Sequence, residues 1–369
     1  MFRVTEFPKE DQRRRRSVLH VDSATTFRGG QRQLLLLAAA QSSDSLSPDP
    51  TLLVRCPRLI EDAHCHGLAV ERWHGPASPF GLWQLRRAIA RLSNPLIHAH
   101  DSRSHGAVRF VATKKEQALL VVHRRIDDAP RQRRLTRWKY AKGEIICVSE
   151  AVLEVMASFG VEQSRLHLVH STLPERPAPG VEAVAARCAP PLSLKLLAIG
   201  ALVPHKGHKT LIEAMARTDE MVKLRIVGAG PLRAALIALV CEHGLGDRVV
   251  LVGDTPALEE EISAADLLVQ PSLSEGLGTA VLDAMWAALP VLASDVGGLS
   301  ELVEDGVTGW LVAPGSPAVL GEQIRQLARA KEKEPGVLAR HGIAGRARAE
   351  RYFAFSEMVR KTNDVYYGC

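Results

Sequence analysis

The stretch from Leu267 to Val312 constrains the fold of this 369-residue chain more than any other part. It opens with the apolar run Leu267–Val269, which is typical of a buried parallel strand. A turn with two glycines follows, and good helix formers then run from Ala280 to Ala288. A strand, a glycine turn and a helix in this order predict a unit of a doubly wound α/β sheet, with an anion site at the start of the helix.

Charged and backbone groups around this turn indicate what it binds. Two carboxylates flank the start of the helix, Glu275 before it and Asp283 one turn after Thr279. A carboxylate beside a phosphate would be repelled, so Glu275 is better suited to accept hydrogen bonds from the hydroxyl groups of a sugar. The backbone N–H groups that would point toward a phosphate belong to Gly276, Leu277, Gly278 and Thr279.

This stretch resembles the nucleotide-sugar signature of family-4 retaining glycosyltransferases, in which two acidic residues are separated by seven others. The pair here is Glu275 and Asp283, and residues 290–303 and 305–312 also follow the family pattern. The resemblance implies an α/β protein with the GT-B fold, in which two doubly wound, Rossmann-like domains face each other across a cleft. It also implies a retaining, metal-independent transfer of a sugar from a nucleotide-sugar to a hydroxyl acceptor, without a cofactor.

The resemblance also suggests roles for the two acids. In the family the first acid contacts the donor sugar and the second holds the ribose of the nucleotide. Glu275 is therefore a candidate catalytic residue, and Asp283, which is one methylene shorter than the usual glutamate, is the expected ribose ligand.

A lysine after the strand predicted at 194–200 is the expected partner of the leaving diphosphate. Lys206 lies on a proline- and glycine-bearing loop, where its ammonium group can neutralise that charge, so it is a candidate catalytic and donor-binding residue. The family commonly adds an arginine where this chain has Ala201. Either Lys206 works with His205 or Lys209, or the leaving group is stabilised less. The donor site is further expected to include Gly200, Gly230 and Gly253.

The first half of the chain offers a second set of strand ends. A strand at 18–21 precedes Gly29 and Gly30, which resemble the family's glycine loop near the acceptor or the diphosphate. A strand at 95–101 ends at His100 and Asp101, which should face a ligand because ligands bind at the carboxyl ends of such strands. The resemblance makes His100 a candidate catalytic residue, against the alternative of a satisfied histidine at a sheet end. His98 is expected on the opposite face or in packing.

A basic segment follows the strand predicted at 117–123. That strand ends at His123 and Arg124, which suit an acceptor phosphate or carboxylate. Residues 124–142 carry eight basic and two acidic side chains, with Trp138 and Tyr140 between them. Such a segment could rest on an anionic membrane surface, grip a phosphorylated acceptor, or be a solvated basic face. No motif supports a nucleic-acid partner.

Length and composition set the remaining limits. A chain of 369 residues with 46% hydrophobic residues suggests two domains, and no apolar run approaches the roughly 20 residues of a spanning helix. The six cysteines show no paired spacing, which favours free thiols and a cytoplasmic location, either in solution or peripheral on the inner face of the membrane. No metal site is predicted. Arg233 replaces the third glycine of a dinucleotide fingerprint, so a dinucleotide site is disfavoured.

The expected parts are a disordered basic tail (1–16), an acceptor-side domain (17–180), a linker (181–192), a nucleotide-sugar-binding domain (193–351) and a helix that crosses back to the first domain (352–369).

The expected partners are a nucleotide-sugar donor and a glycan or lipid-linked acceptor, as in the synthesis of cell-envelope glycans or lipopolysaccharide. Two other functions stay open. A nucleotide-sugar epimerase of the same fold would need an acid–base pair and no acceptor. The third possibility is a non-catalytic sugar or nucleotide binder. Its only support is that Ala201 and Asp283 depart from the family pattern.

Overall fold

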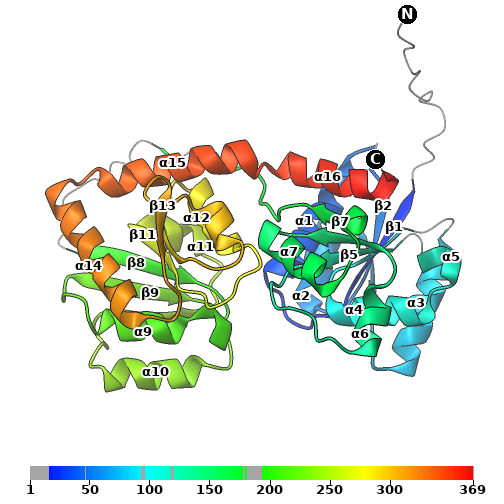
Figure 1. Ribbon diagram of the computed structural model, residues 1–369, viewed down its shortest axis with the longest axis horizontal. Coiled ribbons are helices and arrows are strands. Elements are labelled where there is room, and N and C mark those ends of the chain that lie inside the picture. Colours follow the sequence, from blue (N-terminus) through cyan, green and yellow to red (C-terminus); the bar gives the residue numbers. More distant parts are fainter. Residues whose placement is uncertain are drawn as a thin grey trace, which may run out of the picture. The chain divides into compact units, whose positions relative to one another are not determined.

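The computed structural model describes residues 16–368 apart from 46, 93–95, 118–119, 178 and 181–192. The chain divides into two compact units (Figure 1). Unit 1 contains residues up to 124, 133–146 and those from 359, and unit 2 contains 125–132 and 147–358. The predicted linker and, apart from Arg16, the predicted tail lie outside the described residues. The domain bounds proposed from the sequence therefore stay a prediction.

The first sheet has seven strands in the order β3-β2-β1-β4-β5-β6-β7. Its strands are β1 (Ser17–Asp22), β2 (Asp49–Val54), β3 (Ala69–Arg72), β4 (Leu96–Ala99), β5 (Leu120–Arg124), β6 (Glu144–Cys147) and β7 (Leu166–Leu168). The helices of this part of the chain are α1 (Gly29–Ser43), α2 (Pro57–Cys65), α3 (Pro79–Arg91), α4 (Ser102–Val111), α5 (Lys114–Gln117), α6 (Arg134–Tyr140), α7 (Glu150–Phe159) and the 3-10 helix η2 (Gln163–Arg165).

The second sheet, in unit 2, has six strands in the order β10-β9-β8-β11-β12-β13. They are β8 (Leu194–Ile199), β9 (Val222–Val227), β10 (Val249–Gly253), β11 (Leu267–Gln270), β12 (Val291–Ser294) and β13 (Gly309–Val312). The helices are η3 (Pro204–Lys206), α9 (His208–Met215), α10 (Arg233–Glu242), α11 (Leu258–Ala264), α12 (Thr279–Trp286), α13 (Leu299–Leu302), α14 (Pro317–Lys333), α15 (Val337–Tyr352) and α16 (Phe355–Tyr367), which ends in unit 1.

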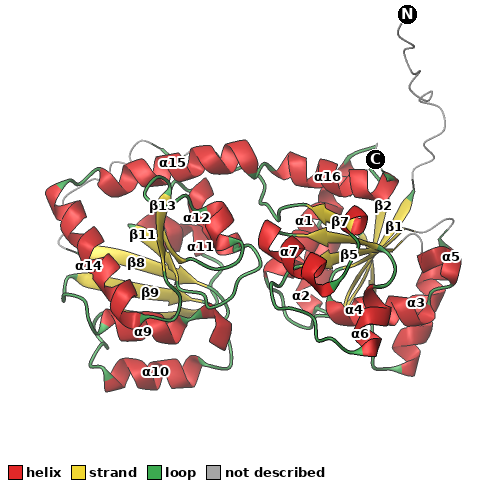
Figure 2. Cartoon of the chain, viewed as in Figure 1, coloured by secondary structure: helices red, strands yellow, loops and turns green. Residues whose placement is uncertain are grey.

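Both sheets reverse their strand order at one point. In the first sheet β1 pairs in parallel with β2 on one side and with β4 on the other. In the second, β8 pairs in parallel with β9 and with β11. Figure 2 shows the strands of each unit flanked by helices. The predicted fold class, two doubly wound α/β sheets, is confirmed. Ligands of such sheets bind outside the carboxyl ends of the strands on either side of the reversal.

Local sequence signals explain several element ends. The predicted helix 150–159 is confirmed, and the hydroxyl of Ser149 caps it by accepting a hydrogen bond from Val152 N at 3.2 Å. Gly160 ends the helix with φ +99°, a conformation that suits glycine. The Gly29–Gly30 pair was expected in a turn, but it forms the first turn of α1, because the hydrogen bond from Arg28 N to the Gln31 side chain starts the helix earlier.

Each unit has its own apolar core. In unit 1, Leu34 of α1 packs with Leu52 of β2 and Leu59 of α2, and all three are fully buried. In unit 2, Leu211 of α9 and Ile226 of β9 belong to a larger cluster. Within the described residues Cys56, Cys65, Cys147 and Cys241 are free thiols, as expected. None of the helices in the described residues has the length and apolar character needed to cross a membrane.

A buried ion pair in unit 2 generates a stability prediction. The Nζ atom of Lys331, whose side chain is 2% exposed, lies 2.7 Å from Oδ1 of Asp266. The other carboxylate oxygen accepts a hydrogen bond from the Lys195 backbone N–H. Lys331→Met should cost about 3–5 kcal/mol in the free energy of unfolding measured in urea, because it leaves a buried carboxylate without its cation. Lys333→Met, on the exposed side of α14, should change it by less than about 0.5 kcal/mol. Equal effects would contradict the assignment.

Candidate functional site

The predicted donor residues gather where the strand order of unit 2 reverses. The loop after β8 carries Gly200 and Lys206, and the loop after β11 carries Glu275. Both loops leave the carboxyl ends of neighbouring parallel strands, so their polar groups reach the same edge of the sheet.

Lys206 and Glu275 form an ion pair at this edge. The Nζ atom of Lys206 lies 2.5 Å from Oε2 of Glu275, and both side chains are largely buried. The same carboxylate oxygen accepts hydrogen bonds from Ser272 Oγ at 3.1 Å and Gln270 Nε2 at 3.4 Å. The sequence analysis gave Lys206 and Glu275 separate partners and missed Gln270 and Ser272. Their signal was available, since both are polar residues at the end of a buried strand.

The turn around Glu275 requires glycine at several positions. A Cβ atom on Gly276 would lie 2.0 Å from the backbone oxygen of Arg125, and Gly278 has φ +101°. A Cβ atom on Gly297, which has φ +50°, would lie 2.1 Å from the backbone oxygen of Glu275. These close approaches fix the path of the turn, because any side chain there would force the backbones apart.

Asp127 holds this turn from outside the second sheet. Its carboxylate accepts hydrogen bonds from the Glu275 backbone N–H at 3.1 Å and from Ser274 Oγ at 2.5 Å. From the sequence, Asp127 was recognised only as one of the two acidic residues of the basic segment 124–142, and no role was predicted for it. No local signal could have revealed this contact, since 148 positions separate Asp127 from Glu275.

The helix α12 begins at Thr279, directly after this turn. Its cap is Gly278, which has no side chain to accept the first N–H groups, so these can serve an anionic ligand. Leu277 is buried, so only its backbone is suited to contact a ligand.

Asp283, the expected ribose ligand, is buried in α12 and ion-paired. Its Oδ1 atom accepts a hydrogen bond from Arg176 Nη2 at 2.8 Å. The backbone oxygen of Arg176 in turn accepts one from Arg346, which also donates to the backbone oxygen of Trp286. Arg346 therefore ties the segment that carries Arg176 to the carboxyl end of α12. Sequence reasoning missed Arg176.

The three expected donor glycines differ in their surroundings. Gly200 is next to Lys206, because a Cβ atom on it would lie 3.6 Å from Cδ of the lysine. Gly230 packs on Leu202 instead, with 2.5 Å between such a Cβ atom and the Leu202 backbone oxygen. Gly253 ends β10 with φ +88° and open space around it.

In unit 1, Asp101 lies at the reversal between β1 and β4. Its carboxylate accepts hydrogen bonds from the Ser23 backbone N–H at 2.6 Å and hydroxyl at 2.8 Å. It also caps α4 by accepting from the backbone N–H groups of Arg103 and Ser104. The carboxylate therefore joins the loop after β1 to the start of α4.

His100 and His123 belong to a buried group of four histidines. The His20 and His98 side chains face the same side of the first sheet, and the His98 and His100 rings stack with centroids 4.0 Å apart. The prediction that His98 points to the opposite face is wrong, because side chains two positions apart on a strand share a face; its alternative, packing, is correct. The His98 and His123 ring centroids lie 5.3 Å apart.

Three of these histidines also have a spacing that could suit a metal ion. One nitrogen from each of His20, His98 and His100 lies within 4.8 Å of the others. A hydrogen bond of 2.8 Å between Nδ1 of His20 and Nε2 of His100 already accounts for the approach of that pair.

Arg124, at the end of β5, is buried and close to Lys139 of α6. Burial and the neighbouring charge of Arg124 lower the pKa of Lys139 to about 8, although Asp101 acts in the opposite direction. The Lys139 ammonium group donates to the Ser102 hydroxyl at 2.6 Å. Two cations here suit an anionic group of a ligand. The sequence analysis counted Lys139 only as part of the basic segment.

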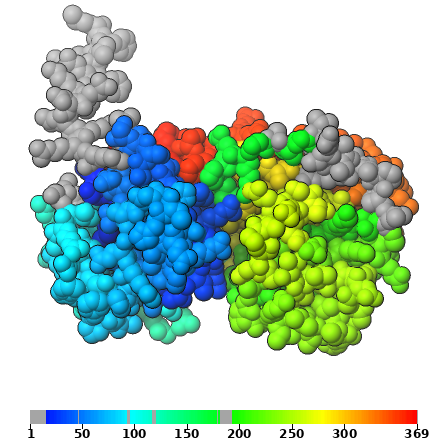
Figure 3. All heavy atoms as spheres, turned by 180° about the vertical axis from the view of Figure 1, so that it is seen from behind, coloured from blue at the N-terminus to red at the C-terminus, as the bar shows by residue number. Residues whose placement is uncertain are grey.

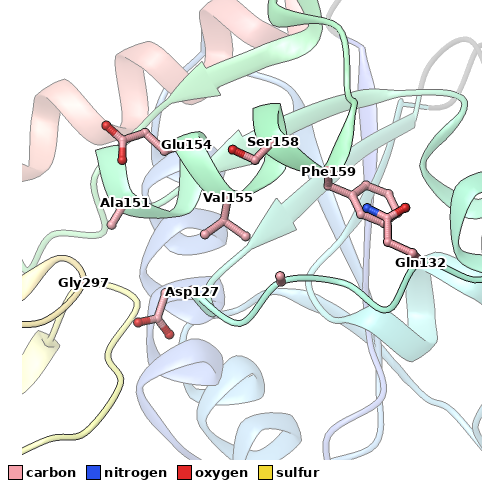
Figure 4. A pocket seen from close by; sticks show the side chains of 9 residues that line it. Asp127, Gln132, Ala151, Glu154, Val155, Ser158, Phe159 and Gly297 are labelled. Atoms are coloured by element: carbon pink, nitrogen blue, oxygen red, sulfur yellow. The ribbon is translucent and has the colours of Figure 1, made fainter.

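A pocket of about 460 Å³ is lined in part by Asp127 and Gly297, two of the residues that contact the Glu275 turn (Figure 4). Its wall on α7 includes Glu154, Ser158 and Phe159 (Figure 4). Carboxylates, a hydroxyl group and an aromatic ring in one lining suit a hydroxyl-rich molecule.

Glu301 positions α7, which forms that wall. Its carboxylate accepts hydrogen bonds from His170 Nε2 at 3.1 Å and from the backbone N–H groups of Glu150 and Ala151. Burial alone would raise the pKa of Glu301, but these hydrogen bonds outweigh it and hold the pKa below its usual value.

Two family models match the sequence. One is described as Glycosyltransferase Family 4 and matches residues 46–173, and the other, Glycosyl transferases group 1, matches residues 190–338. The chain belongs to glycosyltransferase family 4.

Individual relatives agree with the family. The D-inositol 3-phosphate glycosyltransferase of Streptomyces bingchenggensis is 29% identical over 82% of this chain and 64% of its own length. The amylovoran biosynthesis glycosyltransferase AmsK of Erwinia amylovora is 30% identical over 43% of this chain and 41% of its own. The chain thus spans less than two thirds of the length of these curated relatives.

A solved structure fits the fold. HepE of Anabaena, crystallised with UDP and glucose, has a TM-score of 0.82 at 18% identity and covers 96% of this chain and 100% of its own. The predicted GT-B fold is confirmed.

His208, next to Lys206, generates a prediction about pH. Burial, together with the charge of Lys206, lowers its pKa from 6.5 to about 4. Between these values the unfolded chain binds a proton that the folded chain excludes, so the free energy of unfolding should fall as the pH drops from 6.5 to 4. His208→Gln should flatten this part of the pH profile, measured by urea unfolding. His243→Gln, exposed after α10, is the matched control and should leave it unchanged. Identical slopes in wild type and His208→Gln would contradict the prediction.

Proposed function

We propose that this chain is a retaining, metal-independent glycosyltransferase that moves a sugar from a nucleotide-sugar to a hydroxyl acceptor. The observation that carries the proposal is the ion pair of Lys206 and Glu275 at the strand reversal of unit 2. An ammonium group for the leaving diphosphate and a carboxylate for the sugar hydroxyls stand side by side there. The complex of HepE with UDP and glucose supports UDP-sugars as the first donors to test.

In the proposed reaction the bond between C1 of the sugar and the diphosphate oxygen breaks, and the nucleoside diphosphate leaves with the electron pair. The acceptor oxygen bonds to C1 on the same face, and its proton passes to the departing phosphate oxygen. Negative charge therefore grows on the diphosphate, where Lys206 and the N–H groups of residues 276–279 stabilise it. Glu275 holds the sugar hydroxyls and Asp283 the ribose, with Arg176 orienting the shorter acid.

Each unit by itself offers groups that we propose for the acceptor side. The pocket beside Asp127 suits acceptor hydroxyls, through Glu154 and Ser158. Arg124 and Lys139 suit an acceptor phosphate. The remaining proposed acceptor-side residues are Gly29, Gly30, His100, Asp101 and His123. A cell-envelope glycan, lipid-linked or of lipopolysaccharide type, is the acceptor class we favour, and the name of the relative AmsK supports a polysaccharide pathway.

Glu275→Gln tests the donor site. We expect sugar transfer to fall by about 100-fold or more, because the neutral amide no longer balances Lys206 or accepts strongly from the sugar. The melting temperature should stay close to that of the wild type. The measurement is mass spectrometry of products from each nucleotide-sugar, with Glu242→Gln on the exposed face of α10 as control. Activity retained in Glu275→Gln would remove the donor-site assignment, and a nucleotide-sugar converted without an acceptor would indicate an epimerase.

We further propose that unit 1 rests on an anionic membrane surface on the inner face of the cytoplasmic membrane. Phe110 of α4 and Leu135 of α6 are each 73% exposed, and Trp138 is 42% exposed. The helices α4 and α6 contact each other. Exposed cations are present at the start of α6 and along it, namely Arg133, Arg134 and Arg137. Exposed apolar side chains together with exposed arginines on the same helix are typical of a surface that lies in the headgroup region.

Charge reversal tests this surface. Arg134→Glu with Arg137→Glu should lower the fraction bound to phosphatidylglycerol vesicles by about tenfold or more, because each basic residue contributes about 1 kcal/mol there. Binding to phosphatidylcholine vesicles should be weak throughout. The control, Lys333→Glu with Arg351→Glu, makes the same charge change on exposed positions of unit 2. Equal losses of vesicle binding in both double variants would show that only the net charge of the protein matters, and would contradict a membrane surface on unit 1.

A further inference from the structure

A continuous chain of hydrogen bonds in unit 1 runs from an exposed carboxylate to His100. Ser47 Oγ lies 2.6 Å from Asp44 Oδ2, and Asn363 Nδ2 lies 2.8 Å from Ser47 Oγ. Gln41 Nε2 lies 3.1 Å from Asn363 Oδ1. The last two links join Gln41 Oε1 to His20 at 3.0 Å and His20 to His100 at 2.8 Å.

The polarity of the chain follows from its first member. An ionised carboxylate can only accept hydrogen bonds, so the Ser47 hydroxyl donates its one proton to the hydrogen bond with Asp44. The side-chain atom of Asn363 that meets Ser47 must therefore donate, which makes it the amide nitrogen and leaves the amide oxygen to accept. Gln41 is oriented in the same way, with its nitrogen toward Asn363 and its oxygen toward His20.

The same logic fixes both imidazoles. His20 must donate from Nε2 to the Gln41 oxygen, so a neutral His20 accepts at Nδ1. The group that donates to it is Nε2–H of His100. A neutral His100 is then protonated at Nε2 and presents Nδ1 as a hydrogen-bond acceptor.

We propose that Asn363 is a positioning residue that, through Gln41 and His20, holds His100 in the tautomer with an accepting Nδ1. In that form His100 can accept a hydrogen bond from a hydroxyl group of donor or acceptor. This catalytic consequence rests on the proposed function, whereas the tautomer itself does not.

The proposal gives the last helix, α16, a role beyond packing. Asn363 and Tyr366 lie one turn apart on it, and the Tyr366 hydroxyl lies 2.6 Å from His98 Nδ1. The space-filling view shows the red atoms of α16 against blue atoms of the first part of the chain (Figure 3), in agreement with the hydrogen bond between Asn363 and Gln41. A segment that lies 268 positions from His98 in the sequence thus completes the surroundings of the β4 strand end.

Nuclear magnetic resonance of the full chain with ¹⁵N-labelled histidine tests the tautomer directly, because the protonated and unprotonated ring nitrogens give distinct signals. At neutral pH we expect His20 and His100 to carry their protons at Nε2, with the His100 signal assigned from His100→Gln. Asn363→Leu removes the oriented amide and should give mixed tautomers. Asn363→Asp, an isosteric acceptor for Gln41, should keep the wild-type tautomer.

Activity provides the second readout. Transfer should fall about tenfold or more in Asn363→Leu and be largely retained in Asn363→Asp, since a wrong histidine tautomer can cost up to about 10⁴-fold in a protease triad. Ser47→Ala, which removes the anchoring hydroxyl with little change in volume, should also mix the tautomers and covers the case that Asn363→Leu does not fold.

Three results would overturn the proposal. They are a wild-type His100 protonated at Nδ1, the same tautomer in Asn363→Leu and Asn363→Asp, and stoichiometric zinc binding that shifts His20, His98 and His100 together. The expected tautomers without any sugar transfer by the wild type would instead count against the proposed function alone.

Discussion

The ion pair between Lys206 and Glu275 is the interaction on which the site of unit 2 depends. Two loops from neighbouring strands bring opposite charges to one sheet edge, where partial burial strengthens the attraction between them. The glycines of the turn and the carboxylate of Asp127 then fix the backbone that carries Glu275. A ligand with a diphosphate and hydroxyl groups can share this pair, because it offers an anion to the lysine and donors to the carboxylate.

Unit 1 places hydrogen-bonded polar side chains beside its sheet. Four histidines, two amides and a tyrosine are packed beside the first sheet, and such groups are stable in a protein interior only when their hydrogen bonds are made. A network of this kind has a direction, since each amide and imidazole must donate at one end and accept at the other. The chain of hydrogen bonds runs in that direction from Asp44 at the surface to His100 at the strand end.

Sequence alone predicted what depends on neighbouring residues. Buried strands were recognised from short apolar runs, and Lys206 and Glu275 from their places after two of them. Contacts between distant positions could not be read in this way. Arg176 meets Asp283 across 107 positions, and Asn363 meets Gln41 across 322, with no local pattern at either end. The error over His98 was avoidable, because the two-residue period of a strand already places it beside His100.

The most direct test of the donor site is mass spectrometry of the purified wild-type chain with UDP-, GDP- and ADP-sugars, first alone and then with candidate acceptors. The account predicts slow release of the nucleoside diphosphate from one donor alone, and transfer with retained anomeric configuration once an acceptor is present. Nucleotide binding without cleavage of any donor under either condition would contradict it and indicate a binding protein.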